Sequence, residues 1–368
     1  MRNALKRAFY AWVFLFLKKF YGGPSIMWWD VVLAILLLIA GFGALIKGAD
    51  WFVDGAAGIA AKLRIPTLVI GLTIVAFGTS APELATSLIS ASEQSVGIAI
   101  GNILGSNICN ILLILGLSAS IAILPIHKDS LKVDLPVLLF ASVLLIVFGV
   151  TGDEISRWEG GIMAALLAIY TAYLVVNALK NRDGAKIEDL DNHEVESEEK
   201  KGFDAWYNRM KGYTWFLAVI LVLGLGVVVG GAMMAVEGAK TIAGMLGVSE
   251  NIIGLTVVAI GTSLPELITS VMAAKKGETD IAVGNIIGSN LFNILMVGGL
   301  SAVIFPLPFA PDGNSFLSDG IIALGAAAIL AVFAYLPGHK LKKWQGIVMV
   351  AGAVAYYTFT VLRAVGVF

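Results

Sequence analysis

The sequence predicts an all-α integral membrane protein of about ten transmembrane helices, arranged as two inverted five-helix repeats with broken helices at an ion site. Its composition is that of a membrane protein, because 58% of the 368 residues are hydrophobic and only 14% are charged, whereas a soluble domain has about 25% charged residues. Apolar runs such as residues 133–151 approach the roughly 20 residues that a helix needs to cross a bilayer. A motif of 17 residues also occurs twice, which predicts the repeat.

The predicted helices follow the segments of high hydropathy. These runs are long and continuous and do not alternate with a period of two, so they indicate helices and not a transmembrane barrel. Each is expected to form one span: 29–61, 66–92, 95–124, 133–151, 158–179, 214–245, 251–274, 279–305, 316–337 and 343–366.

Two further segments are predicted to lie outside the bilayer core. Residues 1–25 hold a short apolar run between basic flanks, which indicates an amphipathic segment on the membrane surface. Residues 181–212 are rich in charges of both signs and are predicted to form a cytoplasmic loop, with a short interfacial helix within residues 203–216. The first repeat then comprises residues 26–180 and the second comprises residues 213–368.

The two halves align with a constant offset. "GLTIVAFGTSAPELATS" from residue 71 matches "GLTVVAIGTSLPELITS" from residue 254 at 13 of 17 positions, an offset of 183. Five spans in each half is an odd number, so the second half must enter the membrane from the opposite side, as in inverted-repeat secondary transporters. Basic residues number 16 on the side of the central loop and 7 on the other, which predicts a cytoplasmic loop and extracellular termini.

Each copy of the motif carries a glutamate next to a proline within an apolar region. An ionisable residue at this depth is costly and indicates a functional site. Pro82 lacks a backbone N–H, so the helix is expected to break near residues 78–81 and to leave carbonyl groups that a cation can satisfy. The candidate ligands are Glu83, Thr79, Ser80 and the carbonyl of Ala76, with Glu266, Thr262, Ser263 and Ala259 as their equivalents. The structural alternative is an ion pair between a glutamate and Lys47 or Lys240.

The third span of each half adds a polar face. Serine and asparagine recur at a spacing of four, which places them on one side of a helix; these residues are Ser106, Asn110, Ser289 and Asn293. Asn102 and Asn285 are expected to serve mainly in packing or backbone capping. The combined donor set of carboxylate, hydroxyl, carbonyl and amide groups suits a hard cation such as Ca²⁺. Na⁺ can use the same oxygens, so competition of the two ions for two shared carboxylates would produce coupled antiport.

Other classes of protein are disfavoured. The sequence shows no nucleophile–base arrangement, phosphate-binding loop or zinc-ligand spacing, so an enzyme is not expected. A cation channel would have a symmetric pore, whereas two inverted halves with broken helices favour a carrier. The expected partners are the lipid bilayer and the transported Ca²⁺ and Na⁺ ions, without a cofactor or nucleic acid, in a protein of the cell membrane that works as a monomer.

The motifs "GTSAPEL" and "GTSLPEL", each followed by "GNIxGSNxxN", resemble the two α-repeats of the sodium/calcium exchanger family, and the short central loop resembles that of a prokaryotic member. The resemblance implies one calcium site flanked by three sodium sites. It implies that Glu83 and Glu266 are the shared central ligands and that Asn110 and Asn293 face the middle of the site. Backbone carbonyl ligands would come from Thr79, Thr262, Ala76 and Ala259. Hydroxyl ligands would come from Ser80, Ser263, Ser106 and Ser289.

The chain departs from the family pattern at one of these positions. Sodium/calcium exchangers tend to have an aspartate where this chain has Asn293. A site with one acidic group fewer could bind fewer sodium ions or depend more on protons. The alternative function is therefore an H⁺/Ca²⁺ antiporter that uses the same glutamates.

Overall fold

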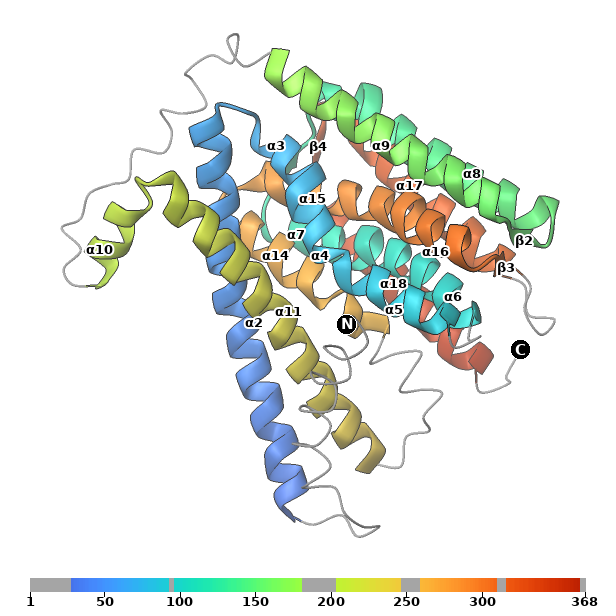
Figure 1. Ribbon diagram of the computed structural model, residues 1–368, viewed down its shortest axis with the longest axis horizontal. Coiled ribbons are helices and arrows are strands. Elements are labelled where there is room, and N and C mark those ends of the chain that lie inside the picture. The colour runs from blue at the N-terminus through green and yellow to red at the C-terminus, as the bar shows by residue number, and fades with distance from the viewer. Residues whose placement is uncertain (1–27, 93–95, 181–202, 246–258, 310–315, 365–368) are drawn as a thin grey trace.

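The computed structural model describes residues 28–92, 96–180, 203–245, 259–309 and 316–364 (Figure 1). Within these ranges, nine helices are long and apolar enough to cross a membrane, which agrees with nine of the ten predicted spans. The remaining predicted span, 251–274, begins outside the described residues and continues as α13 and α14. The predicted surface segment 1–25 and most of the predicted central loop also lie outside them.

The first repeat follows the predicted order of spans. Its elements are α2 (Trp28–Leu63), α3 (Thr67–Ile70), η1 (Gly71–Val75), α4 (Ala76–Thr79), α5 (Ala81–Ser92), α6 (Val96–Ile108), η2 (Cys109–Leu115), α7 (Gly116–Ile121), β1 (Leu124–Pro125), η3 (Ser130–Asp134), α8 (Leu135–Thr151), β2 (Glu154–Ile155) and α9 (Arg157–Lys180). The segments η1, η2 and η3 are π-helical turns within longer helices.

The second repeat has the same order where it is described. The short helix predicted before it is present as α10 (Phe203–Met210). Its elements are α11 (Thr214–Met245), α13 (Ala259–Thr262), α14 (Leu264–Lys275), α15 (Thr279–Leu291), η7 (Phe292–Gly298), α16 (Gly299–Ile304), β3 (Leu307–Pro308), α17 (Leu317–Tyr335), β4 (Lys340–Leu341) and α18 (Lys343–Ala364).

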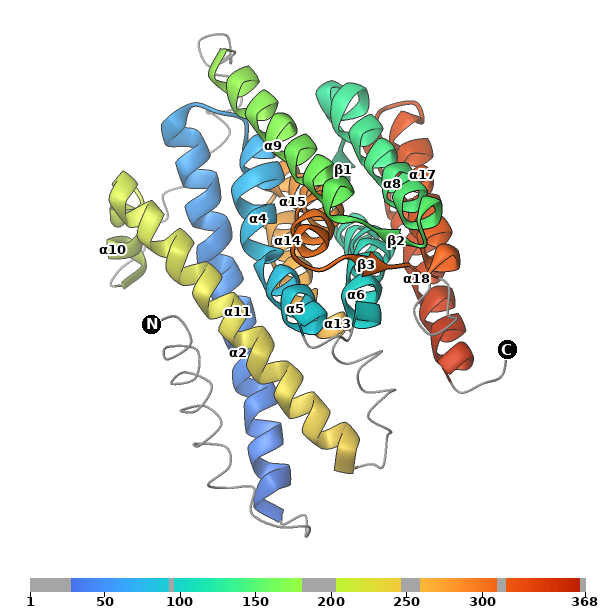
Figure 2. The ribbon, with the colours of Figure 1, turned by 45° about the vertical axis from the view of Figure 1, so that its right-hand side comes forward.

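Two short strand pairs show that the repeats are inverted. β1 follows the third span and pairs with β4, which precedes the tenth, whereas β2 precedes the fifth span and pairs with β3, which follows the eighth. Since α8 runs from the side of β1 to the side of β2, the two sheets lie at opposite ends of this helix (Figures 1 and 2). The equivalent strands β1 and β3 therefore lie in different sheets at opposite ends of α8, as two repeats of opposite orientation require.

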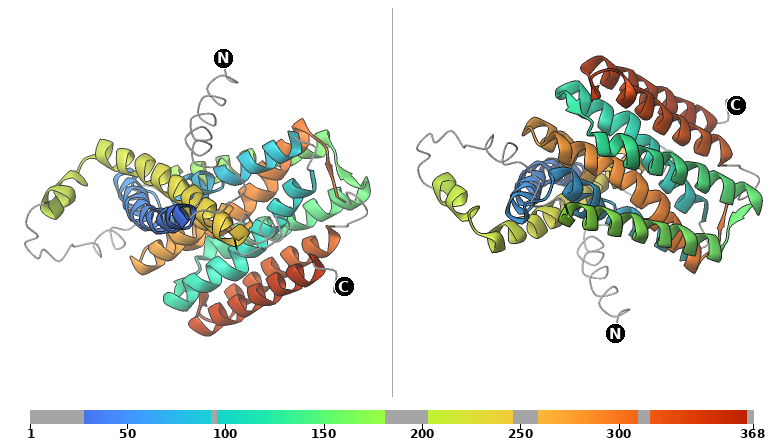
Figure 3. Two further views of the ribbon diagram at one scale, coloured as in Figure 1. Left: turned by 90° about the horizontal axis from the view of Figure 1, so that it is seen from below. Right: turned by 90° about the horizontal axis from the view of Figure 1, so that it is seen from above.

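Helices α2 and α11, the first span of each repeat, pack against each other in antiparallel orientation at one end of the molecule (Figure 3). Glycines spaced by seven residues line the contact and bring the backbones together: Gly41, Gly48 and Gly55 on α2, and Gly224, Gly231 and Gly238 on α11. A Cβ atom added at Gly231 would lie 2.8 Å from both the Gly41 carbonyl oxygen and the Leu45 amide nitrogen. Small residues drive such close helix association in membranes, where the lipid is as apolar as the side chains.

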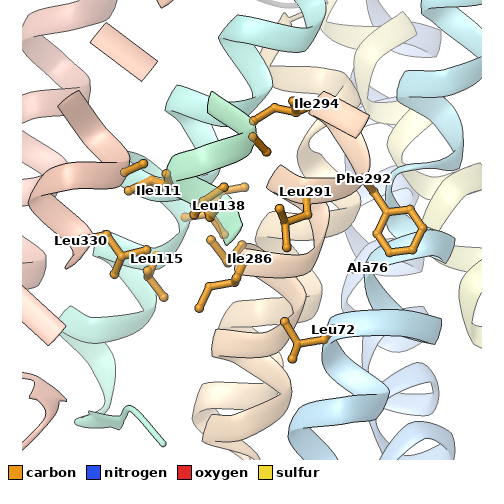
Figure 4. Packing of buried hydrophobic residues seen from close by; sticks show 14 of the residues in the cluster. Leu72, Ala76, Ile111, Leu115, Leu138, Ile286, Leu291, Phe292, Ile294 and Leu330 are labelled. Atoms are coloured by element: carbon orange, nitrogen blue, oxygen red, sulfur yellow. The ribbon is translucent and has the colours of Figure 1, made fainter. Parts of the chain in front are cut away.

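The interior of the bundle is formed by α15 and η7, with their neighbours on each side. In the most apolar stretch of 18 residues in the eighth span, Thr279–Ile304, 89% of the residues are buried. In the corresponding stretch of the first span, which α2 forms, 22% are buried. Figure 4 shows Ile286 and Leu291 of this span between Leu72 of η1 on one side and Leu115 of η2 on the other. The helices that carry the repeated motifs thus occupy the centre, and α2, α9 and α18 occupy the periphery.

A cluster of charged residues ties α2 to the rest of the protein. The Nζ atom of Lys276, which follows α14, lies 2.6 Å from Asp50 and 2.7 Å from Asp54 on α2. Lys211, after α10, binds the second oxygen of Asp54 at 2.5 Å, and Tyr207 donates a hydrogen bond to it. Burial and the Asp54 charge raise the pKa of Tyr207, so this hydroxyl stays protonated at neutral pH and remains a donor.

Replacing Lys276 with methionine is expected to lower the free energy of unfolding by about 1–2 kcal/mol, because two carboxylates on α2 then lose their shared cation. Breaking a fully buried pair costs about 3–5 kcal/mol, and the 23% exposure of Lys276 reduces this value. The measurement is the melting temperature of the detergent-solubilised protein. Lys275→Met is the control, since the adjacent Lys275 is exposed; equal effects of the two substitutions would contradict the role of the cluster.

Candidate functional site

The two motif glutamates occupy equivalent positions just after a break in a membrane helix. Ser80, with φ −84° and ψ 1°, separates α4 from α5, and Ser263, with φ −89° and ψ 5°, precedes α14. The predicted break near residues 78–81 is thus confirmed, and Pro82 and Pro265 lie directly after it. Glu83 and Glu266 fall in the first turns of α5 and α14, and helix N-termini favour negative charge.

Both glutamates are buried in the protein. Glu83 is 1% exposed and Glu266 is 0% exposed. Ser80 of the first repeat donates a hydrogen bond of 3.3 Å to Oε1 of Glu266 in the second repeat. The structure therefore places Glu266 in contact with the helix break that precedes Glu83. The alternative pair with Lys47 is not formed, since Lys47 binds Asp50 at 2.8 Å.

Four of the hydroxyl groups predicted from the motifs meet in pairs between the repeats. The Thr79 hydroxyl lies 3.3 Å from the Ser289 hydroxyl, and Ser263 donates to Ser106 at 3.4 Å. Each of these two contacts crosses between the repeats. The Ala76 carbonyl, expected to be freed by the break, accepts the Ser80 N–H at 3.0 Å, so only its second lone pair is available to a cation. Ala259 begins α13, and its side chain is outside the described part.

Two asparagines lie in π-helical turns at equivalent points of the third and eighth spans. Asn110 is the second residue of η2, and Asn293 is the second residue of η7. Both are 0% exposed. A π-turn shifts the residues that follow it around the helix axis and is frequent at functional sites. The sequence motifs located these asparagines, but the helical spacing on which that prediction relied did not reveal the π-turns.

Several buried polar atoms of the glutamates and of these two asparagines have no hydrogen-bond partner within the described ranges, and η7 packs against α5 as η2 packs against α14. They are Oε1 and Oε2 of Glu83, Oε2 of Glu266, and the side-chain oxygen and nitrogen of Asn110 and of Asn293. A buried polar group without a partner costs about 1–3 kcal/mol, and more if it is charged. Carboxylate and amide oxygens are ligands of hard cations. The unpartnered groups are therefore of the chemical kind that suits a hard cation.

Sequence reasoning left Ser87 and Ser270 out of the candidate site. Each lies four residues after a glutamate, on the same face of its helix. Both are buried, and each accepts a hydrogen bond from an asparagine side chain of its own repeat, at 3.0 Å from Asn102 and at 2.8 Å from Asn285. The spacing of four from the glutamate was the signal that could have identified them.

Known proteins resemble this chain over most of its length. A family model described as "Sodium/calcium exchanger protein" matches residues 33–176 and 216–362. The sodium/calcium exchanger MaX1 of Methanosarcina acetivorans is 36% identical over 350 residues, which cover 89% of this chain and 98% of that protein. The inner membrane protein YrbG of Escherichia coli is 33% identical over 327 residues, covering 89% of this chain and 96% of that protein.

Solved structures show the same fold. The sodium-calcium exchanger NCX_Mj, in crystals soaked with Na⁺ and Sr²⁺, superimposes with a TM-score of 0.73 at 33% sequence identity. The match covers 90% of this chain and 98% of that one. The similarity therefore extends over both repeats and includes the helices that carry the buried glutamates.

Proposed function

The chain belongs to the sodium/calcium exchanger family and is a multi-pass membrane exchanger of cations, and from this premise we propose that it exchanges Ca²⁺ for Na⁺ at a site formed by Glu83 and Glu266. The observation that supports this site most directly is the burial of both carboxyl groups at the interface of the repeats, with oxygens that lack a protein partner in the described residues. A cation supplies the missing partner.

The proposed mechanism depends on competition for the same oxygens. Two carboxylates balance the charge of one Ca²⁺, and Na⁺ ions can occupy the same and adjacent oxygens. The loaded site is stable with either ion, whereas two buried carboxylates without a cation repel each other. The protein then changes its access only when the site is loaded, and this requirement couples the movement of one ion to that of the other.

The driving ion is tested by flux into proteoliposomes. We expect an outward Na⁺ gradient to drive uptake of labelled Ca²⁺ and a pH gradient at equal Na⁺ to drive little. Uptake driven by the pH gradient but not by the Na⁺ gradient would favour the alternative, an H⁺/Ca²⁺ antiporter that uses the same glutamates. The reason for this alternative is Asn293, a neutral side chain where sodium/calcium exchangers tend to have an aspartate.

Asn293→Asp is expected to increase the sodium dependence of Ca²⁺ transport. A third carboxylate attracts cations, and about 1 kcal/mol of added attraction corresponds to a roughly fivefold lower Na⁺ concentration at half-maximal exchange. The measurement is the Na⁺ titration of Ca²⁺ uptake. Asn110→Asp, the equivalent change in the first repeat, serves for comparison. An unchanged Na⁺ titration in Asn293→Asp would remove Asn293 from the ion site.

We propose the membrane orientation from the charge distribution. The connections on the side of the central loop carry 16 basic residues against 7 on the other side, which favours a cytoplasmic loop and extracellular termini. Three connections on the side of the central loop are in contact through Asp280. This residue accepts a hydrogen bond from the Thr67 hydroxyl, and its Oδ1 atom lies 2.9 Å from Nε2 of His127. Since both repeats contribute to the proposed site, a single chain is sufficient and the functional unit is proposed to be a monomer.

A further inference from the structure

Two asparagines that the ion site does not include connect the two repeats next to the glutamates. Asn102 of α6 donates to the Ser87 hydroxyl at 3.0 Å and to the backbone carbonyl of Glu83 at 3.3 Å. Its side-chain oxygen accepts the Thr262 hydroxyl of the other repeat at 3.4 Å. Asn102 thus joins the helix of one glutamate to the helix break that precedes the other.

The same arrangement recurs on the opposite side of the repeat axis. Asn285 of α15 donates to the Ser270 hydroxyl at 2.8 Å, and its side-chain oxygen accepts the Thr79 hydroxyl at 3.0 Å. These residues are separated from the first set by the repeat offset of 183. Two independent copies of the same cross-repeat contact argue against a chance packing contact.

We propose that Asn102 and Asn285 are positioning residues that set the geometry of the helix breaks and transmit ion occupancy from one repeat to the other. The proposal rests on the proposed function, because the threonines that they hold belong to the proposed site. It replaces the simpler expectation that these asparagines only pack or cap the backbone.

The physical basis is the choice of acceptor open to the threonine hydroxyl. The Thr79 hydroxyl has one proton and lies 3.0 Å from the Asn285 oxygen, 3.1 Å from the Val75 carbonyl and 3.4 Å from the Ala76 carbonyl. A threonine within a helix ordinarily donates to the carbonyl three or four residues before it. Asn285 offers the nearest of the three acceptors, so it draws the proton away from both backbone carbonyls and fixes the hydroxyl toward the other repeat.

The same bonds explain how the repeats would be coupled. A cation that pulls Glu266 or Thr79 moves groups that are hydrogen-bonded through Asn285 to Ser270, one turn from Glu266. The amide group is rigid and both of its ends are engaged, so displacement at one end is passed to the other. Neither asparagine touches the ions in this proposal, and both act through the side chains that do.

A double-mutant cycle tests the contact. Asn285→Leu and Thr79→Val each remove the hydrogen bond and keep the number and branching of the side-chain heavy atoms. Each is expected to raise the Ca²⁺ concentration at half-maximal uptake by about tenfold, the equivalent of roughly 1.4 kcal/mol. Together they should raise it no more than either does alone, because the same interaction is lost. The proposal would be overturned if the factor measured in the double variant equalled the product of the two single factors. It would also be overturned if neither single variant changed the half-maximal Ca²⁺ concentration.

A matched control and a second site complete the experiment. Asn290→Leu removes an equally buried asparagine on the same helix, whose amide donates to the Ile286 carbonyl of its own helix and to no residue of the other repeat within the described ranges; its half-maximal Ca²⁺ concentration should stay within twofold. If Asn285→Leu does not fold, the equivalent cycle with Asn102→Leu and Thr262→Val gives the same test.

Glu266→Gln in the same assay separates the proposed ion site from the proposed positioning role of the asparagines. Transport that persists in this variant refutes the proposed ion site itself. Transport that is lost in Glu266→Gln, together with independent effects in the asparagine–threonine cycle, refutes only the positioning role.

Discussion

Glu83→Gln and Glu266→Gln are each expected to abolish Ca²⁺ transport while leaving the protein folded. Glutamine keeps the volume of glutamate and removes its charge, and the loss of one of two carboxylates leaves a divalent cation unbalanced in a low-dielectric site. A loss of more than about 3 kcal/mol in ion binding corresponds to more than roughly a hundredfold in affinity. The measurement is labelled Ca²⁺ uptake into proteoliposomes that contain equal amounts of monodisperse protein.

Glu159→Gln provides a matched control for these variants. Glu159 is 6% exposed and is also a membrane-helix glutamate, but it accepts hydrogen bonds from the amide and hydroxyl of Ser156 at the start of α9. At the equivalent point of α18 the chain already has a glutamine, since Gln345 accepts the Lys342 amide at 2.6 Å. Glu159→Gln should therefore retain transport. Retained transport in both Glu83→Gln and Glu266→Gln would exclude these residues from the ion site.

Gly231→Ala is expected to destabilise the pair formed by α2 and α11 and to impair transport. The added methyl group would lie 2.8 Å from backbone atoms of Gly41 and Leu45, and backbone atoms cannot move aside as the end of a side chain can. Overpacking of this kind costs about 1–3 kcal/mol. The effect is measured as a fall in melting temperature and in the rate of Ca²⁺ uptake, both relative to the unmodified protein.

The neighbouring residue supplies the control for the glycine contact. A Cβ atom added at Gly230 meets no described atom within 4 Å, and alanine is favoured over glycine in a helix by up to about 1 kcal/mol. Gly230→Ala should therefore leave stability unchanged or raise it. Equal destabilisation by both substitutions would show that helix flexibility, and not the close approach of α2 and α11, sets the requirement for glycine.

Much of the architecture could be predicted from the sequence because the information is local. Nine predicted spans correspond to described helices with ends shifted by a few residues, since hydropathy over about 20 residues determines insertion. The helix break before Glu83 was predicted from Pro82, because the missing N–H acts on the backbone within one turn. The inversion followed from the odd number of spans in each repeat.

The partners of individual polar side chains could not be predicted in this way. Spacing placed Asn102 and Asn285 on helix faces, and packing or capping was the expected role, whereas each joins a threonine of the other repeat. The Lys276 cluster was also missed: Asp50 and Asp54 were not matched with a cation, because the lysine lies 222 residues from Asp54.

The sequence by itself determined that this chain crosses the membrane in two related halves and carries one buried glutamate in each. Hydropathy, proline chemistry and the internal repeat act within a single helix or by simple counting, so they can be read without coordinates. Only the tertiary structure decided which groups meet: Ser80 with Glu266, Thr79 with Asn285, and α2 with α11 along their glycines. Such contacts depend on how helices far apart in the chain rotate and pack against one another, and no local pattern specifies that rotation.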